Sequence, residues 1–390
     1  MYLDNHPEAD HLAERWNYLT PDNHPNPAEK PIHKIDNLQK LRMADLACGS
    51  GHILNVGFDL FMDLYKEEFV SRANAVEQIL KHNLIGIDID DRARQLAMFS
   101  LTLKACQHAP GFEKRFVRPN VMSMPKPYAE ELYGDRDKTL HSFFKGLKKD
   151  DTMAEVNVAY DLMQDAKSLG SIMKIQISNR TRIIITQALE FWESRQEIPE
   201  EIEMQFMAMR VILALSQTYS AIVMNPPYMG TGNMNPVLSK YVKENYEEGK
   251  ADLSSVFMQV AENLLEENGK YAMINMQSYM FLSSFEKLRK HIINTMHIDS
   301  LLHLRPRTFD EIGGEVVQNA AFVIAKHQPQ SEPGSYYRLI EQKTCKAEHE
   351  AFISNRLSTT DSNRINYGKV PQSNYEKIPA NQLGIGSVRR

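Results

Sequence analysis

The feature that most restricts the fold of this chain is a short apolar strand that runs directly into a glycine-rich turn. Residues 43–47 form the strand, and the turn is Asp45-Leu46-Ala47-Cys48-Gly49-Ser50-Gly51. A largely apolar helix is predicted from His52 onward, and residues 84–87 form a second strand before another helix over 91–107. Alternation of strand and helix is typical of an α/β protein built on a parallel sheet.

The alternation stops near residue 125 and resumes near residue 218. Between them the chain is polar and turn-rich up to residue 150, and helical in pattern from about 152 to 217. Four segments are therefore predicted: an N-terminal loop and helix segment (1–40), a sheet domain in two pieces (41–125 and 218–328), a mainly helical insertion (126–217), and the start of an incomplete C-terminal region (329–390).

Further elements follow from the same patterns. The helix over 91–107 is expected to bury Leu96, Phe99, Leu103 and Cys106 on one face. The other strands are predicted at 116–121, 219–224, 270–276, 298–304 and 317–326, and the other helices at 52–64, 73–81, 252–267 and 284–296.

Composition excludes several classes of protein. The formal net charge is −5, so any nucleic-acid contact must be local. No apolar run approaches a membrane span, and the first residues do not resemble a secretory signal, so no membrane contact is expected. Cys48, Cys106 and Cys345 have no paired spacing, which excludes a disulfide framework and fits the reducing cytoplasm. The N-terminal histidines match no ligand spacing, so no metal site is expected.

The glycine turn has the properties of a ligand-binding loop. Glycines allow positive φ and close approach, and the helix that follows presents free N–H groups. A glycine turn after the first strand usually serves a nucleotide. This one is not a phosphate-binding Walker loop, because no Lys-Ser/Thr pair follows, and it lacks the third glycine of a dinucleotide fingerprint. A plain tight turn is the alternative.

Two polar residues fit the other strands of such a site. Asp88 ends the second strand, where a carboxylate can accept hydrogen bonds from both ribose hydroxyls. Its alternative role is to cap the next helix, but Asp90 suits that role better. Asn120 lies where an amide could meet an adenine amino group, although an ordinary loop asparagine is the better interpretation from sequence.

A rigid turn follows the strand at 219–224. Its residues are Asn225-Pro226-Pro227-Tyr228, in which the prolines fix φ and Asn225 is biased to extended geometry. The Asn225 side-chain oxygen and the Pro226 carbonyl could both accept from one planar NH2 group, and Tyr228 offers a ring on which a planar base could stack. A structural proline turn is the alternative.

These motifs carry a resemblance. The run Asp45 to Gly51 is similar to the S-adenosylmethionine motif of class I methyltransferases, and Asn225 to Tyr228 resembles the catalytic motif of amino-methyltransferases. In chain order the two motifs resemble γ-type adenine-N6 DNA methyltransferases. The stretches 45–54, 83–104 and 225–232, with the helical insertion, resemble the PglX-like methyltransferases of BREX phage defence. The resemblance covers about residues 40–330, and Leu46 departs from the proline common in this loop.

The resemblance implies an α/β class I methyltransferase fold, S-adenosylmethionine as cofactor and double-stranded DNA as partner, with other phage-defence subunits as further partners. It also implies that residues 329–390 begin a target-recognition region. It places Asn225, Pro226, Pro227 and Tyr228 at the catalytic centre. Around the cofactor it places Asp45, Ala47, Cys48, Gly49, Ser50, Gly51, Asp88, Ile89, Asn120 and Val121.

Two alternatives stay open. The Asn-Pro-Pro-Tyr turn is shared with enzymes that methylate protein glutamine or RNA bases, but those chains tend to have little between the two motifs. Here roughly 170 residues separate Gly51 from Asn225. The other alternative is a DNA-sensing scaffold that binds the cofactor without turnover. No Arg/Lys-rich stripe stands out in residues 40–330, so we also expect this chain to be a fragment that binds DNA only non-specifically.

Overall fold

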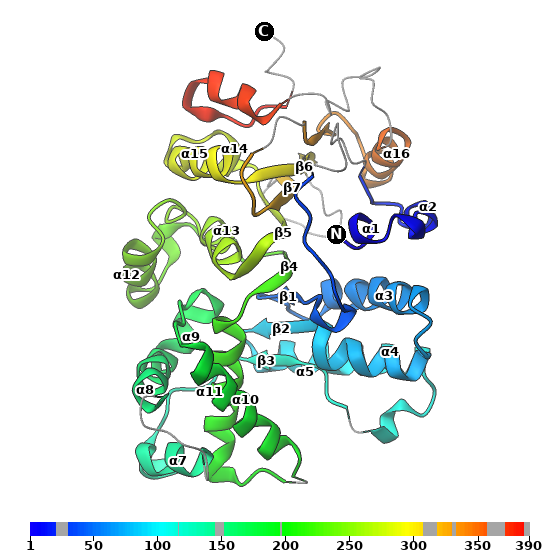
Figure 1. The fold of residues 1–390 in the computed structure, drawn as a ribbon. Helices are drawn as coiled ribbons and strands as arrows, with labels where there is room; N and C mark the ends of the chain where they lie inside the picture. Colours follow the sequence, from blue (N-terminus) through cyan, green and yellow to red (C-terminus); the bar gives the residue numbers. More distant parts are fainter. Residues whose placement is uncertain are drawn as a thin grey trace.

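The glycine turn follows an interior strand of a mixed eight-stranded sheet (Figure 1). The computed structural model describes residues 1–20, 30–115, 117–144, 152–195, 197–306, 318–329, 333–356 and 371–385. The strand order is β3-β2-β1-β4-β5-β7-β6-β8, in which β7 runs antiparallel to both of its neighbours. The strands are β1 (Met43–Asp45), β2 (Leu84–Asp88), β3 (Val121–Ser123), β4 (Tyr219–Met224), β5 (Leu265–Met276), β6 (His297–Pro306), β7 (Gln318–Ala325) and β8 (Ser335–Arg338).

Helices cover both faces of the sheet. Figure 1 shows α3 (His52–Glu67), α4 (Arg72–Gln78) and α5 (Asp91–His108) on one side of β1–β3, with α11 (Glu200–Ser216) on the other. The remaining longer helices are α7 (Arg136–Phe143), α8 (Thr152–Leu162), α10 (Asn179–Glu193), α12 (Pro236–Asn245), α13 (Leu253–Leu264), α15 (Glu286–Thr295) and α16 (Cys345–Asn355). The short helices are α1 (Tyr2–Asn5), α2 (His11–Arg15), α6 (Glu130–Tyr133), α9 (Ala166–Leu169) and α14 (Ser278–Phe281).

The helical block between β3 and β4 shares its core with the sheet. Tyr160, Trp192 and Ile212 from this block belong to the same buried cluster as Ile87 of β2 and Met122 of β3. Continuous apolar packing of this kind holds two elements in a fixed relation. The block therefore covers one sheet face directly, although the division of the chain into domains stays a prediction.

The prediction for the buried face of α5 was wrong for three of its four residues, since only Cys106 packs, partly buried, against the core. Leu96, Phe99 and Leu103 are 58%, 63% and 48% exposed, and the buried face is formed by Ala97, Leu101 and Ala105. The reason is the close approach of the glycine turn, since a Cβ on Gly51 would lie only 2.9 Å from the Cβ of Ala97. Only a small side chain on α5 fits there.

The third strand is shifted toward the C-terminus. It was predicted over 116–121, whereas β3 spans Val121–Ser123, and Phe116 lies outside the described residues. Pro119 has no N–H for a strand ladder. At this point the Gly86 N–H donates to the Asn120 carbonyl at 3.0 Å.

Three further expectations need correction. The segment 125–150 was expected to be turns, but it contains α7, whose Leu140 and Phe143 are buried. The helix predicted over 252–267 ends at Leu264. The sheet was expected to end near Lys326, but β8 pairs in parallel with β6, and Tyr337 of β8 packs in a small core with Phe352 of α16. That residues 329–390 begin a target-recognition region stays a prediction.

In the described part of the chain, no helix has the length and apolar character needed to cross a bilayer.

Candidate cofactor and catalytic site

The loop after β1 is held in a fixed shape by its own backbone. The Cys48 N–H donates to the Ile87 carbonyl at 3.0 Å, and the Gly51 N–H donates to the Cys48 carbonyl at 2.8 Å. Gly49 and Gly51 have φ of +51° and +83°, a region that favours glycine. These residue types are therefore required by the loop geometry itself.

Asp88 ties the ends of β1 and β2 together. Its Oδ2 accepts a hydrogen bond from the Gly49 N–H at 2.8 Å, and its Oδ1 accepts one from the Asp90 N–H at 2.9 Å. Each carboxylate oxygen keeps a second lone pair for a ligand. The helix cap is provided by Asp90, whose side chain accepts from the Arg92 N–H at 2.9 Å. Asp88 is therefore free of the capping role that was its alternative.

The loop begins with a buried carboxyl group, that of Asp45. Asp45 is 1% exposed, and its Oδ1 accepts from the Ala47 N–H at 3.1 Å. Burial, together with the nearby charge of Asp88, raises the pKa of Asp45 to about 7. Burial likewise raises the pKa of the Cys48 thiol above its ordinary value, so this cysteine stays a neutral thiol.

The residues present fit a nucleoside cofactor. A Cβ placed on Gly49 would meet no atom within 4 Å, so the space above this backbone is open. Asp88 offers acceptors for ribose hydroxyls, and the side chain of Ile89 is 45% exposed, as an apolar platform beside an adenine would be. Ala47 and Ser50 belong to the same loop, so the structure brings these predicted residues together at one edge of the sheet.

Asn120 and Val121 lie elsewhere. In the register of β2 and β3, Val121 pairs with Gly86, while Ser123 pairs with Asp88. The carboxyl end of β3, beside Asp88, is therefore formed by Ser123 and the residue after it. Val121 is 1% exposed in the core, and the Asn120 Oδ1 accepts from the guanidinium of Arg210 at 3.0 Å.

The Asn-Pro-Pro-Tyr turn follows β4 directly. β4 pairs in parallel with β1, so Asn225 lies at the same edge of the sheet as the glycine loop. Asn225 is exposed, Pro226 is buried, and Tyr228 is 37% exposed. The Tyr228 hydroxyl lies 3.1 Å from Asn225 Oδ1 and 2.9 Å from the Ile274 carbonyl oxygen of β5. Burial and the charge of Asp252 raise the pKa of Tyr228 to about 12, so the hydroxyl remains protonated.

The far end of this turn is fixed by α13. The Leu253 N–H donates to the Met229 carbonyl at 2.9 Å, and Gly230 forms a bridge with Asp252. Asp252 caps the helix, with its Oδ1 accepting from the N–H and the hydroxyl of Ser254 at 2.8 and 2.7 Å. The predicted start of this helix at residue 252 is confirmed, with Asp252 as its N-cap.

The helical insertion supplies contacts that the sequence did not predict. The Lys167 Nζ donates to the Ile89 carbonyl at 2.7 Å, and the Ser171 hydroxyl donates to the Leu46 carbonyl. The insertion therefore contacts both loops that surround the candidate cofactor site. The sequence around Lys167 and Ser171 carries no recognisable signal for these two contacts. Arg210 does carry one, because it is the single charge in the apolar run 204–215.

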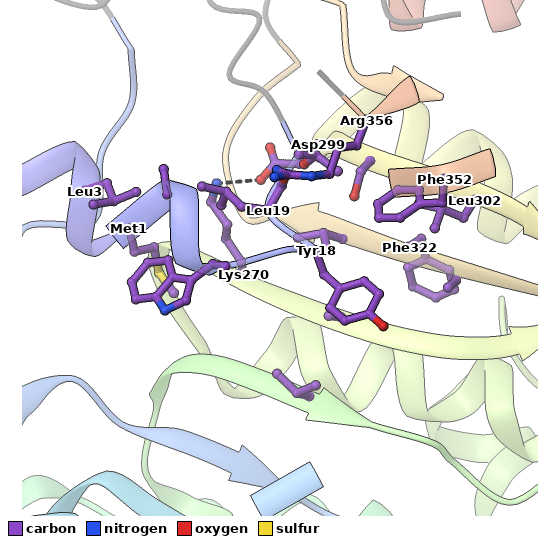
Figure 2. Close-up of a pocket in the computed structure, with 18 of the residues that line it drawn as sticks. Met1, Leu3, Tyr18, Leu19, Lys270, Asp299, Leu302, Phe322, Phe352 and Arg356 are labelled. Atoms are coloured by element: carbon purple, nitrogen blue, oxygen red, sulfur yellow. Dashed lines mark hydrogen bonds and ion pairs between the residues drawn. The ribbon is translucent and has the colours of Figure 1, made fainter. Parts of the chain in front are cut away.

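A cavity of about 1190 Å³ lies on the face of the sheet that carries α1 and α16 (Figure 2). Its lining includes Ile53 of α3 and Met224, the last residue of β4, which precedes Asn225. Figure 2 shows Tyr18 and Leu19 of the N-terminal segment in its wall together with Phe352 and Arg356, and the Arg356 guanidinium donates to the Leu19 carbonyl at 2.9 Å. Lys270 and Asp299 form an ion pair that also lines it. The cavity lining therefore includes both the N-terminal segment and the last residue of β4, which precedes the Asn-Pro-Pro-Tyr turn.

Comparison with known proteins places this geometry in a family. A model of the Eco57I restriction-modification methylase family matches residues 82–309. The chain is 35% identical over 363 residues to the adenine-specific methyltransferase PglX of Lacticaseibacillus casei (strain Zhang), covering 90% of this chain and 29% of the relative. It is 32% identical over 370 residues to the adenine-specific methyltransferase BrxX of Escherichia coli O9:H4 (strain HS), covering 88% and 29%. The chain thus spans less than a third of the length of these relatives.

Solved structures show the same fold. A nuclease-deletion mutant of the Type ISP restriction-modification enzyme LlaGI, in complex with a DNA substrate mimic, matches with a TM-score of 0.52 and 13% identity over 82% of this chain and 23% of that one. The Type ISP enzyme LlaBIII bound to DNA matches with a TM-score of 0.50 and 11% identity over 81% and 18%. The predicted α/β class I methyltransferase fold is confirmed. With a family model that covers more than half of its length, this chain belongs to the Eco57I restriction-modification methylase family.

Proposed function

We propose that this chain carries the catalytic domain of an adenine-specific DNA methyltransferase that transfers a methyl group from S-adenosylmethionine to the N6 amino group of adenine. The relatives PglX and BrxX are adenine-specific methyltransferases, and LlaGI and LlaBIII are restriction-modification enzymes in complex with DNA or a DNA mimic. Double-stranded DNA is accordingly the proposed partner, and other phage-defence subunits are proposed as well.

One observation supports this proposal above the others. The strands β1, β2 and β4 are neighbours and run parallel, and at their carboxyl ends lie the glycine loop after β1, Asp88 as the last residue of β2, and Asn225 after β4. In open α/β sheets ligands bind outside the carboxyl ends of the strands. A cofactor held by the first two elements would therefore lie beside the third, where a substrate amino group would be bound.

The residues of the turn suit an amino nucleophile. Asn225 Oδ1 and the Pro226 carbonyl oxygen would accept the two amino hydrogens, which directs the nitrogen lone pair toward the cofactor. The Tyr228 ring would stack on the base, a contact of about 1–3 kcal/mol, after the base leaves the duplex at a cost of a few kcal/mol. Holding the two reactants in line contributes up to about 7–11 kcal/mol of barrier lowering.

The cofactor residues have separate tasks. The glycine loop leaves space for the nucleoside, Asp88 would bind the ribose hydroxyls, and Ile89 would pack on the adenine ring. When bound, S-adenosylmethionine would supply an electrophilic methyl group; the amino nitrogen would bond to it as the methyl–sulfur bond breaks, leaving S-adenosylhomocysteine, and the nitrogen would release one proton to solvent. No residue of the chain needs to form a covalent intermediate, which agrees with the neutral, buried Cys48 thiol.

Tritiated methyl transfer tests the proposal. The chain is incubated with labelled cofactor and, separately, with unmethylated bacterial DNA, bulk RNA and a glutamine-containing protein extract, and the modified product is identified after digestion. Label recovered as N6-methyladenine from DNA supports the proposal. Label in RNA or protein favours the alternative amino-methyltransferases. Cofactor binding with no transfer to any substrate favours a DNA-sensing scaffold.

A further inference from the structure

The hydrogen bonds around Tyr228 carry an inference that rests on the proposed function and extends it. The Tyr228 hydroxyl has one proton, yet two oxygens lie within hydrogen-bond distance, Asn225 Oδ1 and the Ile274 carbonyl. A hydroxyl donates once and accepts through its lone pairs. It cannot donate to both oxygens at full strength.

The Tyr228 hydroxyl is expected to donate its proton to the Ile274 carbonyl rather than to Asn225 Oδ1. The last residue pair between β4 and β5 is Met224 with Met273, so no β4 residue pairs with Ile274. The Tyr228 hydroxyl, at 2.9 Å, takes the place of the missing backbone donor. A backbone carbonyl can only accept, and leaving one unpaired costs more than the net gain from a typical hydrogen bond.

The side chain of Asn225 can change its role. A half turn about its last bond exchanges the amide oxygen and nitrogen, and the hydrogen-bond partners decide which orientation is populated. With the nitrogen toward Tyr228, Nδ2–H donates to the hydroxyl oxygen, and the hydroxyl donates to Ile274. Both contacts are then satisfied at once, and Oδ1 lies on the side of the amide that points away from the Tyr228 hydroxyl.

We propose that Tyr228 is a positioning residue that orients the Asn225 amide with its oxygen toward the substrate, through the chain Asn225 Nδ2–H to Tyr228 hydroxyl to Ile274 carbonyl. A fixed outward oxygen selects a substrate group that donates hydrogen bonds, such as the NH2 of adenine, and rejects an oxo group at the same place. This role is separate from ring stacking, which needs no hydroxyl.

The contacts around Tyr228 favour a fixed geometry for this hydrogen-bonded chain. The backbone beyond Tyr228 is held by the contacts of Met229 with Leu253 and of Gly230 with Asp252. The position of the Tyr228 side chain is therefore fixed at its Cα end. The Tyr228 hydroxyl also stays protonated well above neutral pH. The amide orientation is therefore set before any substrate arrives, which lowers the ordering cost of binding.

Tyr228→Phe separates the two roles, because it keeps the stacking ring and removes the hydroxyl. Tyr337→Phe is the matched control, since the Tyr337 hydroxyl also donates to a backbone carbonyl, that of Arg356, but from the edge strand β8. Selective 15N-asparagine labelling gives a readout that needs no turnover. The Asn225 side-chain amide signals are those missing from the Asn225→Asp spectrum.

The inference predicts that Tyr228→Phe shifts the Asn225 side-chain amide signals, while Tyr337→Phe leaves them in place. In methyl transfer to unmethylated DNA, kcat is expected to fall about tenfold in Tyr228→Phe, the effect of one hydrogen bond lost in the transition state, with KM for both substrates unchanged. Unmoved Asn225 signals, or equal shifts in both variants, overturn the inference. If the unsubstituted chain transfers no methyl group, the proposed function fails, and the spectra alone decide the orienting role.

Discussion

The carboxylate of Asp88 accepts a hydrogen bond from the backbone N–H of Gly49 at 2.8 Å. The residue proposed to bind the ribose therefore also holds the glycine loop. One side chain thereby couples the shape of the loop after β1 to the end of β2. Loss of this carboxylate is expected to affect both loop order and cofactor affinity.

Asp88→Ala should weaken binding of S-adenosylhomocysteine by about 1.5–3 kcal/mol, because hydrogen bonds to a charged group are lost. Calorimetry with this product gives the affinity directly. Asp90→Ala is the control, since it removes the cap of α5, two residues along the chain, and should cost about 0.5–2 kcal/mol of folding stability with little change in affinity. Equal affinity in wild type and Asp88→Ala would refute the ribose role.

Gly49→Ala tests whether the space above the loop belongs to the ligand. The added Cβ meets no protein atom, so the folding cost should be limited to the left-handed backbone, about 1–2 kcal/mol. Cofactor affinity should fall much more, because the methyl group occupies the open space. Gly111→Ala is a matched control, with φ of +86° and no atom within 4 Å of its Cβ. A similar affinity in both variants contradicts the prediction.

Asn225→Ala should abolish methyl transfer and leave cofactor affinity within a few-fold, because the side chain is exposed in the turn after β4 rather than in the glycine loop. N6-methyladenine formation measured by mass spectrometry, beside calorimetry on the same protein, gives both values. Near-normal N6-methyladenine formation would remove Asn225 from the catalytic role.

Asp45→Asn should change how folding stability depends on pH. The folded protein keeps the Asp45 proton up to a pKa of about 7, while an unfolded chain releases it near 3.8. The stability that Asp45 contributes is therefore present below pH 4 and is lost as the pH rises through 7, by up to roughly 4 kcal/mol. Urea unfolding should show Asp45→Asn gaining stability relative to wild type between pH 4.5 and 8. A pH-independent difference would show that Asp45 is not protonated in the fold.

Ser171→Ala tests the contact between the insertion and the glycine loop. The variant leaves the Leu46 carbonyl without its hydroxyl donor in a buried position, so about 1–3 kcal/mol of stability should be lost, together with some cofactor affinity. Ser194→Ala removes an exposed hydroxyl from the same insertion and should stay within about 0.5 kcal/mol of wild type. Thermal unfolding with and without S-adenosylhomocysteine measures both effects. If the two variants behave alike, the insertion does not support the loop.

The sequence by itself determined the elements whose signals are local. Gly49 and Gly51 indicated a turn with positive φ, Asp90 indicated the cap of α5, and the order of strands and helices was sufficient to predict the α/β class. The rigid backbone of the Asn-Pro-Pro-Tyr turn could also be predicted, because proline restricts φ wherever it occurs. Its catalytic role, and those of the predicted cofactor residues, stay predictions.

Only the tertiary structure decided what lies against these elements. The buried face of α5 follows Ala97 rather than the larger Phe99, because Gly51 brings the loop within reach of small side chains alone. Strand register moved Asn120 away from the carboxyl edge of the sheet and toward Arg210. Ser171 lies 125 residues from Leu46 in the chain, and its contact depends on the packing of a whole helical block. Such contacts arise from the mutual fit of distant elements, which no local pattern of residues records.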